Sequence, residues 1–151
     1  MYSNQPIVRQ DRSIKMVSHK KIVETDIKAL LSTLWIFVLF NMIFRDIHEF
    51  FRPGLLEEII TGVVNGTQVT EEVMLIGAIM VEIPIVMVFL SRILDYRINR
   101  WANIIIGAIT IALVIGMGQK DLDDLFFATV EVISLSVIVW LAWKWREYIK
   151  H

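Results

Sequence analysis

Four stretches of the sequence are each long and apolar enough to cross a lipid bilayer, and this pattern constrains the fold more than any other feature. They cover residues 29–47, 73–90, 101–117 and 122–143. A spanning helix needs about 20 predominantly apolar residues, and lipid offers no hydrogen-bond partner to other backbone conformations. The chain is also 56% hydrophobic, which is too apolar for a soluble domain of 151 residues. The sequence therefore predicts an all-α integral membrane protein, an up-down bundle of four transmembrane helices.

The distribution of Lys and Arg predicts how the bundle is oriented, because basic residues resist translocation. Twelve of the fifteen lie before the first run, between the second and third runs, or in the tail, whereas acidic residues collect at the opposite ends of the runs. We therefore expect a multi-pass protein of the cell (plasma) membrane with both termini in the cytoplasm. Residues 1–25 are predicted to be a disordered basic cytoplasmic leader, and residues 26–151 the transmembrane domain.

The segment between the first and second runs carries signals for local structure. An apolar stripe that ends in Ile59 and Ile60 lies opposite two glutamates, which predicts a short external amphipathic helix after Pro53. Asn65-Gly66 predicts a tight turn. Thr70 is a suitable cap for the second transmembrane helix.

Several classes of function are not expected. The chain has no cysteine, which excludes disulfides and thiol chemistry. Asp46, His48 and Glu49 are metal-ligand types, but their spacing spreads them around a helix, so no metal site is predicted. We also expect no cofactor, no enzymatic activity and no nucleic-acid partner, because no nucleophile arrangement, cofactor motif or basic domain occurs.

Polar residues inside the apolar runs are the candidate functional residues, because burying them in lipid is costly. Glu82 and Glu131 each lie nine residues in from the external end of their run. At 1.5 Å per residue, both carboxylates are about 13 Å below the external surface. The other two runs place Asn41 and Thr110 near the same depth. Arg45 is one turn nearer the outside on the same helix face as Asn41, and His48 follows on that face.

This layer supports two interpretations. In the first, an outward-facing polar pocket binds or transports a small polar or cationic solute or a proton. Its ligand-binding residues would be Glu82, Glu131, Arg45, Asn41, Thr110 and His48. In the second, the charges only stabilise the bundle of a structural or accessory membrane subunit. The lipid bilayer is the expected environment in both cases, and Ala108 with Ala112 forms a small-residue pair that could pack against a homodimer or membrane-protein partner.

Four segments of the chain together resemble one known protein family. They are Leu31 to Val38, Glu82-Ile83-Pro84, Ser91 to Ile104, and Ala142 to Trp145. The family is a set of small prokaryotic four-span membrane proteins of unknown function, and the resemblance extends over roughly residues 28–145. It implies the four-span fold and no particular activity.

Overall fold

The computed structural model describes residues 5–118 and 121–148, with side chains described for 14–19, 21–118 and 121–145. Its elements in chain order are α1 (Gln5–Glu49), α2 (Leu55–Thr61), β1 (Val63–Val64), β2 (Thr67–Gln68), α3 (Glu71–Ile93), α4 (Tyr96–Gly116) and α5 (Leu122–Tyr148). Four of these helices, α1, α3, α4 and α5, are long and apolar enough to cross a membrane. This confirms the predicted all-α four-span architecture.

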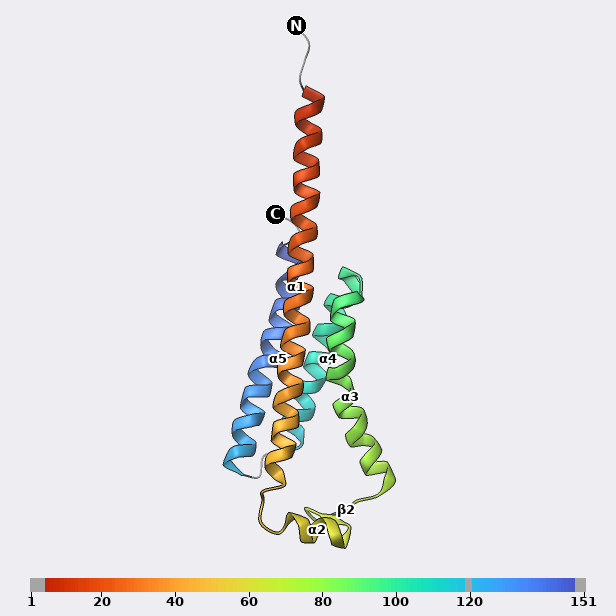
Figure 1. Cartoon of the computed structure of the whole chain (residues 1–151), viewed down its shortest axis with the longest axis vertical. Helices are drawn as coiled ribbons and strands as arrows, with labels where there is room; N and C mark the ends of the chain where they lie inside the picture. The colour runs from red at the N-terminus through yellow and green to blue at the C-terminus, as the bar shows by residue number, and fades with distance from the viewer. Residues whose placement is uncertain (1–4, 119–120, 149–151) are drawn as a thin grey trace.

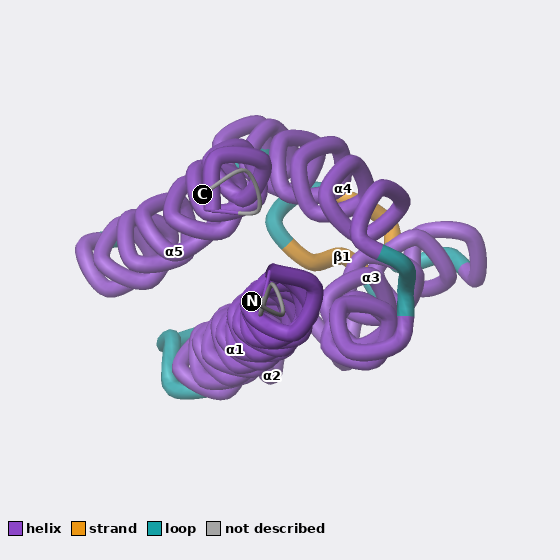
Figure 2. Tube along the Cα trace, turned by 90° about the horizontal axis from the view of Figure 1, so that it is seen from above, coloured by secondary structure: helices purple, strands orange, loops and turns teal. Residues whose placement is uncertain are grey.

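The long helices surround a common axis in the order α3, α1, α5, α4 (Figure 2). Helix α1 packs against both α3 and α5, and α5 packs against α4, whereas α3 and α4 contact each other least. Pro84 lies inside α3, where it removes one backbone hydrogen bond. Figure 1 shows the lower half of α3 leaning away from the other helices. Among neighbouring helices, the bundle is therefore least closed between α3 and α4.

The two ends of the bundle differ, and we name them by what they carry. The hairpin end carries α2 and the β1–β2 hairpin, and the terminal end is the one toward which both chain termini lie (Figure 1). The predicted amphipathic helix is α2, and the predicted turn is the two-residue connection of the hairpin. Asn65 and Gly66 both have positive φ, 52° and 75°, as a type I′ turn requires. Thr70 accepts a hydrogen bond from the Val73 amide and so caps α3 as predicted.

Helix α1 differs from the prediction in the leader. Residues 1–25 were predicted to be disordered, but α1 is helical from Gln5 onward. No glycine or proline interrupts residues 7–49, and Lys28 pairs with Glu24 one turn before it at 3.0 Å. The apolar span therefore continues into a long helix (Figure 1). The side chains of several basic residues used for the orientation argument lie outside the described part: Arg9, Arg12, Lys20, Lys120, Arg146 and Lys150.

The apolar core lies where α1, α3, α4 and α5 meet. It includes Val38 from α1, Met87 from α3, Val114 from α4, and Leu135 and Ile138 from α5. Gly107 of α4 allows close approach of α5, because a Cβ atom there would lie 2.8 Å from a methyl group of Val139. This core separates two clusters of buried polar residues, one toward each end of the bundle.

Candidate functional site

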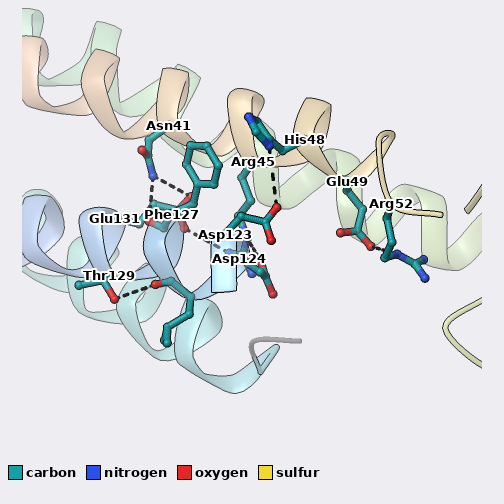
Figure 3. Close-up of polar contacts among 11 residues, drawn as sticks. Asn41, Arg45, His48, Glu49, Arg52, Asp123, Asp124, Phe127, Thr129 and Glu131 are labelled. Atoms are coloured by element: carbon teal, nitrogen blue, oxygen red, sulfur yellow. Dashed lines mark hydrogen bonds and ion pairs between the residues drawn. The ribbon is translucent and has the colours of Figure 1, made fainter. Parts of the chain in front are cut away.

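The first polar cluster joins α1 to α5 in the hairpin-end half of the bundle (Figure 3). It consists of Asn41, Arg45, Asp124 and Glu131, and we call it the charged cluster. Arg45 pairs through Nε with Asp124 and through Nη1 with Oε2 of Glu131 at 3.4 Å. The Asn41 amide donates to Oε1 of Glu131 at 3.2 Å and to the Phe127 carbonyl at 2.9 Å. Both carboxylates therefore share one guanidinium.

The charged cluster is fully buried at Glu131 and partly exposed at Arg45 and Asp124. The Glu131 side chain is 0% exposed, whereas Arg45 is 14% and Asp124 15% exposed. Asp124 and Glu131 are seven residues apart, two turns of α5, so they lie on one face at different depths. A buried carboxylate is tolerated only with close charge and hydrogen-bond partners. Arg45 and Asn41 supply these partners to Glu131.

A cavity of about 330 Å³ adjoins the charged cluster. Its wall comes from α1, α3, α5, the hairpin turn and the end of α4, and its lining residues are Met42, Arg45, Asp46, Glu49, Asn65, Gly77, Met80, Val81, Met117, Gly118, Asp124 and Glu131. Asn65 in the hairpin turn and Gly118 in the loop after α4 place the cavity at the hairpin end. Helix α3 provides Gly77, Met80 and Val81, which precede Pro84 in the chain. The bend of α3 thus leaves space beside the charged cluster.

Acidic groups outnumber basic groups on the cavity wall. Four lining residues are carboxylates and one, Arg45, is a cation. Arg45 pairs with two of these carboxylates, and Glu49 pairs with Arg52, which lies outside the wall, at 2.8 Å. Asp46 is exposed and forms no ion pair with another described residue, although Arg45, its neighbour in the chain, attracts its charge. The cavity wall therefore carries more acidic than basic side chains.

A second cluster of buried polar residues lies in the terminal half of the bundle, and we call it the neutral cluster. It consists of Trp35, Ser91, Asn99 and Asn103, all fully buried. Oδ1 of Asn103 accepts from Trp35 Nε1 at 2.7 Å and from the Ser91 hydroxyl at 3.3 Å. The Asn103 amide donates to Oδ1 of Asn99 at 2.7 Å, and the Asn99 amide donates to the Ser91 carbonyl at 2.7 Å. These bonds connect α1, α3 and α4.

The apolar core separates the cavity from the neutral cluster. Trp35 and Asn41 are six residues apart on α1, so the two clusters are about 9 Å apart along the helix axis. Val38 lies between them on α1 and is fully buried. Within the described residues, the cavity is lined only from the hairpin-end half of the molecule. The terminal side is filled by packed side chains.

Glu82 does not join this site, which corrects the prediction that it is one of the ligand-binding residues of the pocket. It is exposed and does not line the cavity. The buried face of α3 includes Pro84 and Met87. Glu82 is two residues before Pro84 and therefore about 200° around the helix from it. The depth predicted for Glu82 is compatible with the layer of polar residues, but its side chain lies on the exposed face of α3 and not on the face toward the cavity.

Thr110 and His48 are also separate from the cavity. Thr110 is buried on α4, but its hydroxyl donates to the Ile106 carbonyl of its own helix at 2.8 Å. His48 is 55% exposed, lies 3.8 Å from Asp123 and contacts the Phe127 ring. Of the six predicted residues, the structure therefore brings together Asn41, Arg45 and Glu131.

Four lining residues important to the site were not among the predicted ligand residues: Asp46, Glu49, Asp124 and Gly77. Asp124 could have been found, because it repeats at seven residues from Glu131. Glu49 follows Arg45 by four residues and so lies on the same face of α1 one turn further on, whereas the spacing of Asp46 from Arg45 gives no such signal. Gly77 carries no sequence signal for a cavity, because a glycine inside an apolar helix most often serves close packing.

The fold and the cluster geometry define a class: a four-span helical membrane protein with buried charges and a cavity at one end. Comparison with family models then assigns a particular family. The model of a family of unknown function (DUF6326) matches residues 20–150, and the chain belongs to this family. Comparisons with curated proteins and with solved structures find no match.

Proposed function

We propose that this protein binds a small cationic solute in the cavity at the hairpin end, as a binding or transport protein of the cell membrane. The observation that carries the proposal is the wall of the cavity, on which four carboxylates face one guanidinium. A volume of about 330 Å³ is at the lower end of the range for small-molecule sites. Because Met42 and Met80 add apolar surface to the same wall, the proposed solute is an organic or ammonium-type cation.

The roles of the residues follow from their partners. Arg45 positions both Glu131 and Asp124. Glu131 therefore forms the buried part of the proposed site, and Asp124 forms its partly exposed part. Asp46 has no ion pair with another described residue and is the proposed primary contact for the solute. Met42 and Met80 provide apolar, polarizable wall for the methyl or methylene groups of an organic cation.

The test is thermal stabilisation of the purified protein in detergent by ammonium, tetramethylammonium and guanidinium chlorides, with sodium chloride as the ionic-strength control. At least one cation should stabilise the wild type saturably. Asp46→Asn should weaken that effect about tenfold, the result of losing one close charge contact. If no cation acts beyond sodium, or if Asp46→Asn responds like the wild type, the proposal fails.

Two glycines offer a matched pair for the same experiment. Gly77 lines the cavity and Gly116 does not, and a Cβ atom at either position meets no heavy atom within 4 Å. Gly77→Leu should occupy the cavity and abolish cation stabilisation, whereas Gly116→Leu should retain it. Equal responses from the two variants would show that the cation acts elsewhere.

We also propose that the hairpin end faces the outside of the cell, on the positions of Lys and Arg in the sequence. The chain has no cysteine, so single cysteines report sidedness without background. Asn65→Cys at the hairpin turn should react with an impermeant maleimide on intact cells. Thr25→Cys, exposed on α1 before the apolar span, should react only after permeabilisation. The reverse labelling pattern would invert the proposed orientation.

The alternative function is an accessory subunit whose charges only stabilise its own bundle. The mutual pairing of Arg45, Asp124 and Glu131 favours it, and Ala108 and Ala112 are exposed on α4, where a partner helix could pack. This alternative predicts that a membrane protein co-purifies in mild detergent and is lost in the double variant Ala108→Leu/Ala112→Leu. Clean isolation of a stable monomer would contradict it.

A further inference from the structure

At the terminal end of α4 and α5, the guanidinium of Arg100 is held by three contacts. Its Cζ lies 5.3 Å from the ring centroid of Trp101 and 5.8 Å from that of Trp143. Its Nε donates a hydrogen bond to the Ala142 carbonyl at 3.1 Å, which connects α4 to α5. Stacking on aromatic rings is a favourable environment for arginine. The position of this guanidinium is thus set by the fold.

These contacts leave the terminal nitrogens of Arg100 for another ligand. Arginine has five N–H donors, and the Ala142 bond uses only the one on Nε. In the described part of the chain, no carboxylate forms an ion pair with Arg100. The parallel donors of the Nη groups match two oxygens of a phosphate. The charge and geometry therefore fit an oxyanion.

The surroundings of Arg100 have the character of a membrane interface. Trp101 and Trp143 are 52% and 60% exposed, and aromatic residues of this type collect at the level of lipid headgroups. Lys144 lies over the Trp140 ring at 5.0 Å and adds a second cation nearby in the chain. An exposed apolar stripe continues along α4 from Trp101 toward the middle of the bundle through Ile105 and Ile109. A headgroup and an acyl chain thus have adjacent contact surfaces.

We propose that Arg100, Trp101 and Trp143 form a binding site for the phosphate of an anionic phospholipid. Arg100 binds two phosphate oxygens, and the tryptophan rings flank the glycerol region. One acyl chain follows the α4 stripe that contains Ile105 and Ile109. Basic pockets between transmembrane helices commonly bind anionic headgroups. This site is at the opposite end from the cavity and does not depend on the proposed solute.

The test measures lipid retention and stability of the full-length protein. Native mass spectrometry counts phosphatidylglycerol molecules that remain bound, and thermal unfolding is compared after addition of phosphatidylglycerol, phosphatidylcholine or inorganic phosphate. The variants are Arg100→Gln, which removes the charge, and Arg100→Lys, which keeps the charge but loses the planar fork. Arg92→Gln is the matched control, because Arg92 is an exposed basic residue at the same end of the bundle.

The wild type should retain phosphatidylglycerol and be stabilised by it more than by phosphatidylcholine. Arg100→Gln should weaken retention about tenfold, the loss of one charge-assisted pair, and Arg100→Lys should recover only part of it. Equal losses in Arg100→Gln and Arg92→Gln would overturn the site in favour of diffuse surface charge. Equal stabilisation by inorganic phosphate and phosphatidylglycerol would overturn the lipid as its ligand.

Discussion

The charged cluster and the neutral cluster both bury polar residues in the bundle, but they stabilise them in different ways. Each places four polar residues inside an apolar bundle and connects helices that are far apart in the chain. The neutral cluster is fully buried, and its amides and hydroxyl are bonded to one another. The charged cluster borders a cavity, and its two carboxylates share one cation. The comparison favours a scaffold role for the neutral cluster, and it is the basis on which we propose a ligand site at the charged cluster.

The physical reason is the different cost of burial. A buried amide is stable once its hydrogen bonds are made, and nothing more is gained by leaving space beside it. A buried carboxylate carries a charge whose desolvation cost is offset only by a close cation. Carboxylates gathered on one cavity wall repel one another, and a bound cation would relieve that repulsion. Four experiments test this contrast.

The largest effect is expected from removing the cation of the charged cluster. Arg45→Met should lower the free energy of unfolding by about 3 kcal/mol, because Asp124 and Glu131 lose their shared partner. The double variant Arg45→Met/Glu131→Gln should recover a substantial part of this loss. Reversible unfolding in mixed micelles measures both values. A single variant as stable as the wild type would mean that the three charges are not coupled.

The next largest effect is expected in the neutral cluster. Asn103→Leu should cost about 2 kcal/mol, because Trp35 Nε–H and the Ser91 hydroxyl lose their acceptor. The loss should be the same at low and high salt, since none of the four residues is ionised. Thr33→Ala is the control, because its exposed hydroxyl bonds only to its own helix. A strong salt dependence would contradict the proposed difference between the clusters.

A smaller effect is expected at the contact between α4 and α5, which helps to position both clusters. Gly107→Ala should cost about 1 kcal/mol, because the added methyl group meets a Val139 side chain that must move. Gly116→Ala has open space and should be neutral or slightly stabilising. Thermal unfolding of the two variants side by side checks this. Similar behaviour of both would show that α4 and α5 pack more loosely than the structure indicates.

The smallest effect on stability is expected at Asp46. Asp46→Asn should change the free energy of unfolding by less than about 0.5 kcal/mol, because no ion pair with another described residue is lost. The variant loses both the attraction of Arg45 and the repulsion of Glu49, and these two effects oppose each other. The same variant should lose the response to cations. A large loss of stability without cations present would make Asp46 part of the scaffold instead.

From the sequence, the depth of the polar residues along their helices was predicted more successfully than the helix face on which each one lies. Counting along the helices placed Asn41 and Glu131 at one level, and they are hydrogen-bonded. The same counting chose Glu82, which lies on the exposed face of α3. Depth depends only on residue number and helix rise, whereas direction depends on which face of α3 packs against α1. In a helix that is apolar nearly all round, the sequence does not distinguish those faces.

The sequence by itself determined the four spans, the amphipathic α2 and the turn at Asn65-Gly66, because these depend on local composition and spacing. The tertiary structure alone decided that α3 leans outward, that a cavity forms beside Arg45 and Asp46, and that Trp35 meets Asn103 across 68 positions of the chain. Such contacts depend on how separate helices rotate and pack against one another. In lipid, apolar surface provides little preference among those rotations, so close packing and polar pairing select them.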